Sequence, residues 1–312
     1  MSAVVTLAVD AMGGDHGLPV TVPAVARILA RHPDLHVIMV GEPSALAAAL
    51  KKEKLDDHPR LALTPASEVV AMDDPVAVAL RQKKDSSMRV AINQVKEGRA
   101  LAAVSAGNTG ALMAVSRFVL KTLPGVDRPA ICTAIPTAKG HCHMLDLGAN
   151  VDSEPKHLLQ FALMGQAVVR AVDGLSAPRV ALLNIGEEST KGTDLLREAH
   201  AALAESDLDF IGNIESNEIF GDSAEVVVTD GFTGNVVLKL MEGFSKFLLG
   251  LVGREMAQHG ADWAPELLGS VRKKVDYSEY GGALLLGVRG VVVIGHGRSD
   301  PHAVSNAIDL AG

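Results

Sequence analysis

Aromatic residues are scarce in this chain, since Phe, Trp and Tyr together make up only 3% of its 312 residues. Few rings are therefore available to stack on nucleic-acid bases, and a net charge of −8 gives no broad attraction to a phosphate backbone. These features exclude nucleic-acid binding as the main function. Charged residues at 21% and hydrophobic residues at 48% are the balance of an ordinary globular protein.

Cysteine is also rare, and Cys132 and Cys142 are too few for a disulfide framework, which fits a reducing cytosol. The N-terminus lacks the basic region of a signal peptide and enters a strand-like run at once. The weakly charged stretch 100–116 contains Ser, Asn, Thr and Gly, and falls short of the ~20 apolar residues that span a bilayer. We expect a cytoplasmic protein, at most attached to the inner face of the membrane.

Several catalytic motifs are absent as well. The chain has no P-loop, no G-x-G-x-x-G fingerprint and no G-x-S-x-G elbow, so we expect no nucleotide, no other cofactor and no covalent intermediate. His141, Cys142 and His143, with Asp146, are metal-ligand types. Neighbouring residues on a strand point to opposite faces, however, so these side chains cannot all converge, and we expect no metal site.

Short β-rich runs alternate with amphipathic runs along most of the chain, which predicts βαβ units and a mainly parallel sheet covered on both faces. Strands are expected over 4–9, 36–40, 60–63, 102–104, 131–135, 143–147, 179–183, 209–211, 225–229 and 291–294. Helices are expected over 20–31, 45–52, 75–82, 88–97, 108–122, 156–171, 193–205 and 235–258. The length favours two α/β domains, 1–113 with 285–312 and 114–284. The best candidate crossing between them is the Pro- and Gly-containing stretch 124–129.

Small and polar residues follow several of the expected strands, at the side of a parallel sheet where ligands bind. Local turn chemistry would explain one such end, but its recurrence favours a single composite site. The candidate residues are Asp10, Gly13, Gly14, Asp15 and His16; Ser105, Gly107, Asn108, Thr109 and Gly110; Asp146 and Asn150; Asn184, Glu187, Lys191 and Gly192; Asp230, Gly234 and Asn235; and His296 and Gly297.

The segment Ser105–Gly110 is typical of a phosphate or carbonyl cradle, in which Asn108 or Thr109 caps a helix whose free N–H groups attract an anion. An ordinary helix cap explains the same residues. Lys191 is placed to neutralise a phosphate, although a surface lysine is an equal alternative, and the same holds for Lys239. His16 and His296 sit in glycine-rich corners and are the acid–base candidates, with a structural role nearly as probable for each.

Residues 235–258 form an amphipathic pattern with an apolar stripe that includes Phe244, Phe247 and Leu251. The pattern favours a core or dimer-interface helix, and a membrane-surface helix is the alternative. A basic cluster of Arg81, Lys83, Lys84 and Arg89 is either a solvated helical face or a docking surface for an acidic protein.

The motifs, in their order along the chain, resemble those of the bacterial phosphate acyltransferases, the acyl-carrier-protein:phosphate acyltransferases of phospholipid synthesis. The matching segments are Asp10–Gly17, Ser86–Leu112, Arg128–Ala130, Leu145–Asp152, Asn184–Thr193, Asp230–Gly243, Asp276–Gly287 and Gly295–Ser299. Two departures stand out. Ser216 follows Glu215 where the family commonly has glycine, and the chain stops soon after its last expected helix, so a C-terminal helix is expected to be shortened or missing.

The resemblance implies that inorganic phosphate attacks the thioester of a long-chain acyl carrier protein and yields acyl phosphate. It also implies a two-domain α/β/α sandwich similar to phosphotransacetylases and to isocitrate and isopropylmalate dehydrogenases. The family forms homodimers, associates peripherally with the membrane and supplies a membrane glycerol-3-phosphate acyltransferase. The alternatives are a phosphotransacetylase-like enzyme that uses acyl-CoA and a non-catalytic membrane-docking scaffold.

Such a reaction needs no strong base or acid, because phosphate is already partly dianionic and a thiolate leaves readily. The enzyme must hold both substrates and stabilise a tetrahedral oxyanion. We therefore expect Ser105–Gly110 and Asn184–Gly192 to bind phosphate and oxyanion, with Asn235 beside them. Lys191 would stabilise charge, and His16 would donate a proton. Asp10 and Asp15 would fix their corner by hydrogen bonds.

Overall fold

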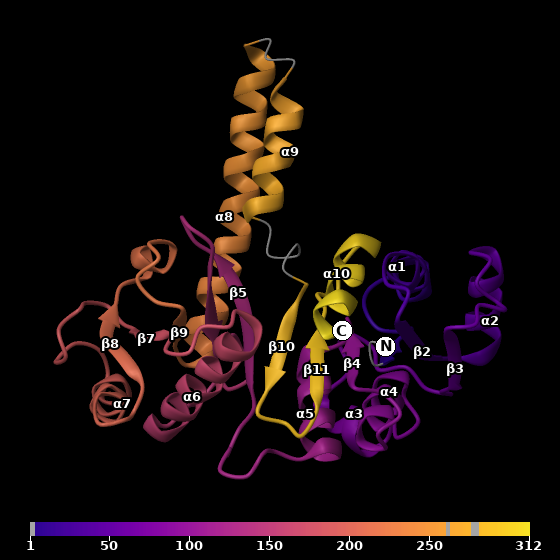
Figure 1. Cartoon of the computed structure of the whole chain (residues 1–312), viewed down its shortest axis with the longest axis horizontal. Helices are drawn as coiled ribbons and strands as arrows, with labels where there is room; N and C mark the ends of the chain where they lie inside the picture. Colours follow the sequence, from indigo (N-terminus) through magenta and orange to yellow (C-terminus); the bar gives the residue numbers. More distant parts are fainter. Residues whose placement is uncertain (1–3, 260–262, 276–280) are drawn as a thin grey trace. The chain divides into compact units, whose positions relative to one another are not determined.

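The computed structural model describes residues 4–259, 263–275 and 281–312. The chain divides into two compact units, Met1–Pro129 with Tyr280–Gly312 and Ala130–Glu279 (Figure 1). These limits lie at other residues than the expected 113/114 and 284/285. Helix α5 (Thr109–Leu120) packs on helices α3 (Val76–Arg81) and α4 (Ser87–Lys96), and it therefore stays whole in the first unit. The first residues of the segment Asp276–Gly287 lie outside the described residues.

The sheet of the first unit has the strand order β3-β2-β1-β4-β11-β10. Its strands are β1 (Val5–Asp10), β2 (Leu35–Gly41), β3 (Leu61–Pro65), β4 (Ala102–Ser105), β10 (Ala283–Leu286) and β11 (Val291–Ile294). Neighbouring strands are parallel except for the antiparallel pair of β10 and β11. The carboxyl ends of β1, β4 and β11 therefore lie at one edge of the sheet.

Helices cover both faces of this sheet, as the side-chain alternation of a strand requires. Leu7 and Val9 of β1 pack with helices α1 (Leu18–Arg31), α2 (Pro43–Lys52) and α10 (Pro301–Ala311). Ala8, between them, faces the opposite way and packs in the cluster that includes Ala91 of α4. In Figure 1, α1 and α10 accordingly lie on one side of these strands, and α3, α4 and α5 on the other.

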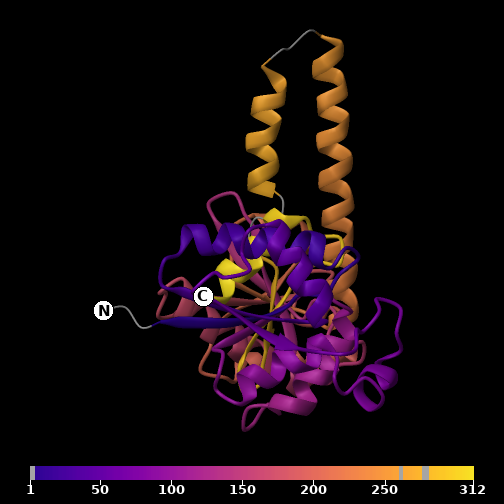
Figure 2. The same cartoon turned by 90° about the vertical axis from the view of Figure 1, so that its right-hand side faces the viewer.

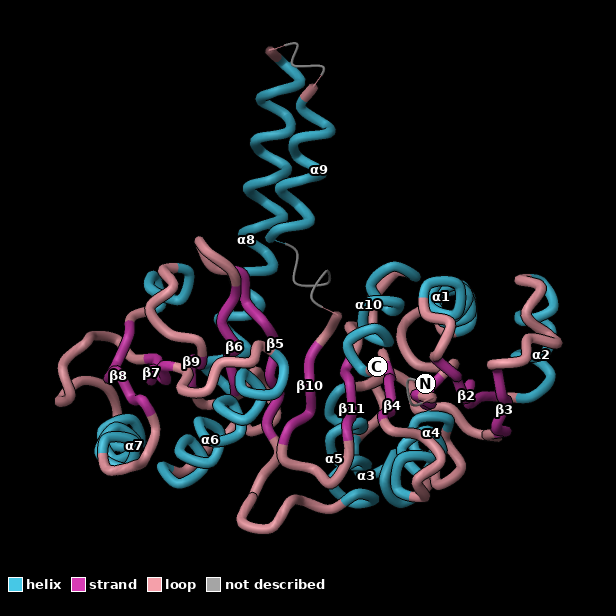
Figure 3. The backbone as a smooth tube through the Cα atoms, viewed as in Figure 1, coloured by secondary structure: helices cyan, strands magenta, loops and turns pink. Residues whose placement is uncertain are grey.

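The sheet of the second unit has the order β5-β6-β9-β7-β8, with β5 antiparallel to β6 and the other neighbours parallel (Figure 3). Its strands are β5 (Ala130–Pro136), β6 (His141–Leu145), β7 (Arg179–Leu183), β8 (Asp209–Ile214) and β9 (Val226–Val228). Helix α6 (Pro155–Val172) packs on β6 and β9, with α7 (Asp194–Ala204) beside it. A short 3₁₀ helix, η1 (Ser216–Phe220), precedes β9.

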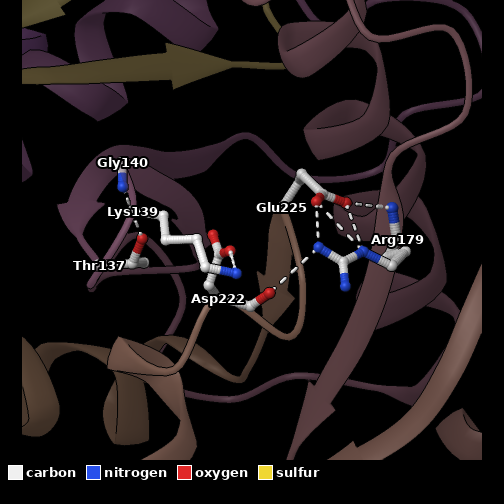
Figure 4. A network of polar contacts seen from close by, with 6 residues as sticks. All are labelled: Thr137, Lys139, Gly140, Arg179, Asp222 and Glu225. Atoms are coloured by element: carbon white, nitrogen blue, oxygen red, sulfur yellow. Dashed lines mark hydrogen bonds and ion pairs between the residues drawn. The ribbon is translucent and has the colours of Figure 1, made fainter.

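An ion pair fixes the start of β7 to the residue before β9 (Figure 4). Arg179 Nη2 lies 2.5 Å from Glu225 Oε1 and donates a hydrogen bond of 3.1 Å to the carbonyl oxygen of Asp222. Asp222 Oδ2 also lies 3.3 Å from Lys139 Nζ in the turn between β5 and β6. Because β7 and β9 are neighbours in the sheet, these contacts hold the first residues of the two strands together.

Helix α8 (Gly231–Gln258) begins four residues before the expected start at residue 235 and runs beside helix α9 (Ala264–Val275), which the sequence analysis did not predict (Figures 1 and 2). Its buried residues are Gly231 and Gly234, in the first turn. The expected apolar stripe is largely exposed, with Phe244 57% and Phe247 60% accessible. The stripe is therefore not core. Within the described residues, no helix is both long and apolar enough to cross a membrane.

Candidate functional site

Asp10, at the end of β1, fixes one corner of the first unit. Its side chain is 2% exposed, and its carboxylate accepts hydrogen bonds of 2.7 Å from Ser105 Oγ and 3.2 Å from the backbone N–H of Met12. Ser105 Oγ in turn accepts a bond of 3.1 Å from the N–H of Gly107. Burial raises the pKa of Asp10, and hydrogen bonds from Ser87 and Ser105 act in the opposite direction. Asp10 is thus an internal scaffold of this corner, and its burial does not favour the direct substrate contact for which it was also a candidate.

The glycines of this corner permit close approach between its loops. A Cβ on Gly13 would lie 2.7 Å from Asp10 Oδ2 and 2.9 Å from the backbone N of Gly107. Gly14 has a φ of +91°, which L side chains rarely adopt, and a Cβ there would lie 3.2 Å from the carbonyl oxygen of Gly297. That oxygen accepts a 2.8 Å hydrogen bond from the N–H of Asp15. The corner therefore joins the ends of β1, β4 and β11 through backbone contacts.

Asn108, one of the two cap candidates from the sequence, caps helix α5. Its Oδ1 accepts a 3.0 Å hydrogen bond from the N–H of Ala111. Its Nδ2 donates to the carbonyl oxygens of Met72 and Asp74, at 2.8 and 3.1 Å, which the sequence analysis did not foresee. The amide is therefore committed to holding the loop at 72–74. Thr109 and Gly110 form the first turn of α5, where free N–H groups and the helix dipole favour an anion.

The remaining candidates of the first unit lie at the rim of this corner. His16 and Asp15 are exposed. Asp15 Oδ2 lies 3.9 Å from Arg298 Nε, whose side chain is 85% exposed, so this pair is weakly held. His296 is half-buried, and its Nδ1 accepts a 3.1 Å bond from the N–H of Arg298. Asp15 is thus a weaker scaffold than Asp10.

Asp146, which follows β6, is a buried carboxylate that accepts hydrogen bonds from its loop, as Asp10 is in the first unit. It is fully buried and accepts backbone hydrogen bonds from Ile131 at 3.0 Å, Ala149 at 2.9 Å and Asn150 at 2.8 Å. The side-chain amide of Asn150 donates a further bond of 2.9 Å. Burial raises the pKa of Asp146, and the hydrogen bonds counter it. Its carboxylate is therefore occupied in shaping the loop at 146–150.

Helix α8 starts directly against that loop. Asp230 caps the helix by accepting bonds from the Thr233 N–H at 2.9 Å and the Thr233 hydroxyl at 2.6 Å. A Cβ on Gly234 would lie only 1.9 Å from the carbonyl oxygen of Asp146. Asn235 follows, exposed, and a Cβ on Gly148 would touch its side chain at 3.4 Å. The structure thus brings Asp146, Asp230 and Asn235 together at the N-terminus of α8.

The loop after β7 folds back on Asn184. The side chain of Asn184 accepts a 2.8 Å bond from the N–H of Ile185 and donates a 3.2 Å bond to the carbonyl oxygen of Lys191. Gly192 has a φ of +85°, and a Cβ there would lie 2.5 Å from Asn184 Oδ1. Glu187 and Lys191 project outwards, and Lys191 Nζ is 3.9 Å from the half-exposed Glu188 carboxylate. The ammonium of Lys191 is thus only loosely paired.

These second-unit groups lie at one edge of their sheet, because β6, β9 and β7 are adjacent and parallel. Leu145 and Leu182 both register with Val228, so Asp146, Asp230 and Asn184 follow neighbouring strand ends. The arrangement presents helix N-termini, glycine-rich loops and a lysine. It can bind an anion and stabilise negative charge on a carbonyl oxygen.

Neither cysteine is suited to act as a nucleophile near these second-unit groups. Cys132 and Cys142 are buried, and burial raises the pKa of both thiols, for Cys142 to about 12. Cys142 Sγ lies 3.7 Å from the carbonyl oxygen of Ile219, away from its histidine neighbours.

Sequence reasoning missed Ser87, whose side chain bonds to Asp10. It lies in the segment Ser86–Leu112, one of those that carry the family resemblance. The basic cluster is partly internal, because Lys83 Nζ bonds to Asp74 at 2.5 Å and Arg89 donates to the carbonyl oxygen of Leu80 at 3.0 Å. These contacts leave less charge for an acidic partner.

Comparison with known proteins gives consistent results. The family model described as "Fatty acid synthesis protein" matches residues 5–312. The chain is 64% identical to a phosphate acyltransferase of Alcanivorax borkumensis, over 99% of this chain and 93% of the relative. It is 53% identical to a phosphate acyltransferase of Paraburkholderia phytofirmans, over 97% of this chain and 84% of the relative.

Solved structures share the fold at low sequence identity. A phosphotransacetylase from Streptococcus pyogenes superposes with a TM-score of 0.64 at 18% identity, covering 98% of this chain and 93% of that one. A 4-hydroxythreonine-4-phosphate dehydrogenase from Klebsiella pneumoniae gives 0.58 at 14% identity, covering 99% of this chain and 98% of that one. The predicted α/β fold with a mainly parallel sheet is confirmed.

Proposed function

Because the chain belongs to the family of phosphate acyltransferases, we propose that it transfers a long-chain acyl group from acyl carrier protein to inorganic phosphate, for phospholipid synthesis. The observation that carries the proposal is the match to such enzymes over nearly the whole chain. The absence of a thiol nucleophile among the two cysteines agrees with direct attack by phosphate.

The proposed reaction has one bond-forming and one bond-breaking step. A phosphate oxygen forms a bond to the thioester carbonyl carbon, and the tetrahedral intermediate then loses the carrier-protein thiolate, which takes up a proton. The products are acyl phosphate and free carrier protein. Catalysis of this kind depends on positioning and on stabilising the oxyanion.

We assign these tasks to groups within each unit. In the second unit, Lys191 stabilises negative charge, and the loop Asn184–Gly192 and Asn235 bind phosphate and oxyanion. In the first unit, the N-terminus of α5 at Ser105–Gly110 binds an anionic group, and His16 is the candidate proton donor. The exposure of Lys191 and His16 supports this division, since neither side chain is committed to the core.

A cavity in the second unit supports a long acyl chain over a short one. It has a volume of about 360 Å³ and is lined chiefly by apolar atoms, including those of Ile135, Leu238 and Met241. Leu238 lies about one helical turn beyond Asn235 along α8, so a chain whose thioester is held at Asn235 can extend into it. Met241→Trp would fill this space and is expected to weaken palmitoyl transfer at least about tenfold more than acetyl transfer.

The donor is tested by incubating the purified protein with palmitoyl carrier protein or acetyl-CoA, with and without phosphate. We expect phosphate-dependent acyl phosphate from the carrier-protein thioester. Preferential use of acetyl-CoA would instead indicate a phosphotransacetylase-like enzyme. Lipid binding without thioester loss would indicate a docking scaffold.

We also propose that the protein is a homodimer that binds the inner membrane surface, where it supplies a membrane glycerol-3-phosphate acyltransferase. The exposed Leu240, Phe244 and Phe247 of α8 support an apolar contact with lipid or a second copy. Replacing Phe244 and Phe247 with Ser separates these occupants. Loss of vesicle flotation with an unchanged mass in light scattering indicates lipid, and halving of the mass indicates a dimer interface.

A further inference from the structure

Two histidines lie on the same face of β6, away from the groups assigned to acyl transfer. His141 and His143 are two residues apart, so the strand directs both side chains to one side, and Cys142 between them to the other. The sequence analysis treated the three neighbours as a single set and therefore expected no metal site. It also took Asp146 as the acidic member, whereas the acidic residue beside the two histidines is Asp173.

Asp173 follows the last turn of α6 and lies between the two imidazole rings. Its Oδ1 is 3.1 Å from His141 Nε2, and its Oδ2 is 2.9 Å from His143 Nε2. The rings stand nearly perpendicular, with centroids 5.1 Å apart. The ligand atoms of all three residues lie within 4.8 Å of one another. Three side chains thus converge on one point from two elements of the second unit.

We propose that His141, His143 and Asp173 bind a zinc ion, with water in the fourth position. Zinc takes imidazole nitrogen and carboxylate oxygen at about 2.0–2.1 Å in a tetrahedron, whose edges are then about 3.3 Å. The two N···O separations of 3.1 and 2.9 Å each involve a different oxygen of Asp173, and the three ligand atoms lie within 4.8 Å of one another, so side-chain rotations would bring the set to such edges. Two imidazoles with one carboxylate suit zinc and neighbouring transition metals, whereas magnesium prefers oxygen ligands alone.

The burial of the three side chains favours an ion that is bound firmly and still exchanges with solvent. The side chain of His143 is 7% exposed, that of Asp173 20% and that of His141 34%. One side of the cluster is therefore closed, and His141 gives access from solvent. The Asp173 carboxylate offsets part of the charge of the ion.

The cluster is separate from the candidate catalytic groups of its unit. His141 begins β6, while Asp146 follows its last residue, a separation of about 15 Å along an extended strand. Zinc here would fasten the start of β6 to the end of α6, in place of two hydrogen bonds. Zinc binding at this cluster therefore does not depend on the proposed acyl transfer.

The test is zinc binding by the full chain after dialysis against a chelator, measured by titration calorimetry. We expect one zinc per chain for the unaltered protein. His143→Ala should weaken binding more than about 100-fold, since removing a ligand costs more than disturbing its neighbours. His259→Ala removes an exposed histidine of the same unit and should leave binding unchanged.

Asp173→Asn keeps the size of the side chain and its capacity to bond to histidine, so it guards against misfolding. Its far-UV circular dichroism should match that of the unaltered protein while zinc affinity falls. Cobalt added in place of zinc should give the intense visible absorption of a tetrahedral site. The proposal is overturned if the unaltered protein binds no stoichiometric zinc, or if Asp173→Asn and His143→Ala bind as well as it does.

Discussion

Lys191 carries the clearest prediction at the scale of a single residue. Its ammonium projects from the loop closed by Asn184 and has only a 3.9 Å pairing with Glu188. Lys191→Ala is therefore expected to lower kcat at least about 100-fold by removing charge stabilisation from the transition state. The unfolding midpoint should stay unchanged, because the side chain is 49% exposed.

A second lysine provides the control for this experiment. Lys239 is exposed on α8, where its Nζ lies 3.0 Å from Glu242. Lys239→Ala should leave kcat within about twofold, because this ammonium is already paired with Glu242 and lies outside the loop assigned to phosphate. Unchanged turnover in the Lys191 variant would remove that residue from the mechanism.

Glu225 gives a prediction about pH. Burial acts to raise its pKa, but hydrogen bonds from the Arg179 side chain and backbone outweigh burial and bring it below the ordinary 4.5. The native state therefore binds fewer protons than the unfolded state, and the contribution to stability is present above pH 4.5 and lost as pH falls through the native pKa. Glu225→Gln should lower the free energy of unfolding near neutral pH by about 1 kcal/mol or less, because solvent screens a partly exposed pair.

Urea denaturation at several pH values checks this account. The difference between the unaltered protein and Glu225→Gln should shrink as the pH is lowered from about 7 to about 3.5. Glu188→Gln, at a carboxylate that is 64% exposed, should show no such trend. A difference that grew on acidification would contradict the assigned role of the Arg179 pair.

At the scale of the element, the start of α8 depends on a contact that a glycine alone allows. Alanine is a better helix former than glycine by about 1 kcal/mol, so Gly→Ala within a helix normally stabilises it. At Gly234 the added Cβ would lie 1.9 Å from the carbonyl oxygen of Asp146, and the clash dominates. Gly234→Ala should destabilise the protein by about 1–3 kcal/mol or more.

Gly243, two and a half turns further along the same helix, is the matched control. A Cβ there meets nothing within 4 Å, so Gly243→Ala should stabilise by up to about 1 kcal/mol. Both changes are measured by thermal or urea denaturation. Equal effects at the two glycines would show that α8 does not pack on the loop at 146–150.

The elements that follow a simple side-chain period could be predicted from the sequence. β1 and α1 are examples, because apolar residues recur at strand and helix spacing and face the core. The start of α8 could not, because Gly231 and Gly234 resemble loop residues until the tertiary contact with Asp146 is known. Helix α9 gave no core-facing pattern either, and most of its described side chains are exposed.

The same limit applies to the candidate site. The glycine-rich segments that follow the strands allowed the loops of the candidate site to be predicted. Parallel strands place their carboxyl ends at one edge of a sheet, so these loops gather there. The sequence did not show how deeply Asp146 is buried or how many N–H groups it accepts, so it was counted among the ligand contacts. Nor did it reveal that Asn108 holds the loop at 72–74. Such roles depend on residues far apart in the chain.

At the scale of the whole molecule, each of the two α/β units carries glycine-rich, helix-capped loops at the carboxyl ends of its parallel strands. The chain belongs to the phosphate acyltransferases, and under the proposed function these loops bind phosphate and the thioester oxyanion, which are both anions. The sequence placed the crossing between the units in the stretch 124–129, and the units divide after Pro129, but the assigned limit at 113/114 lay within α5 because no long linker marks the crossing.

The most direct test of the central claim is a stoichiometric balance with palmitoyl carrier protein as donor. Acyl phosphate, trapped as its hydroxamate, and free carrier-protein thiol are measured together, with and without phosphate. We predict equal amounts of the two products, and neither of them without phosphate. Thioester loss without phosphate, or free thiol in excess of acyl phosphate, would contradict direct acyl transfer to phosphate.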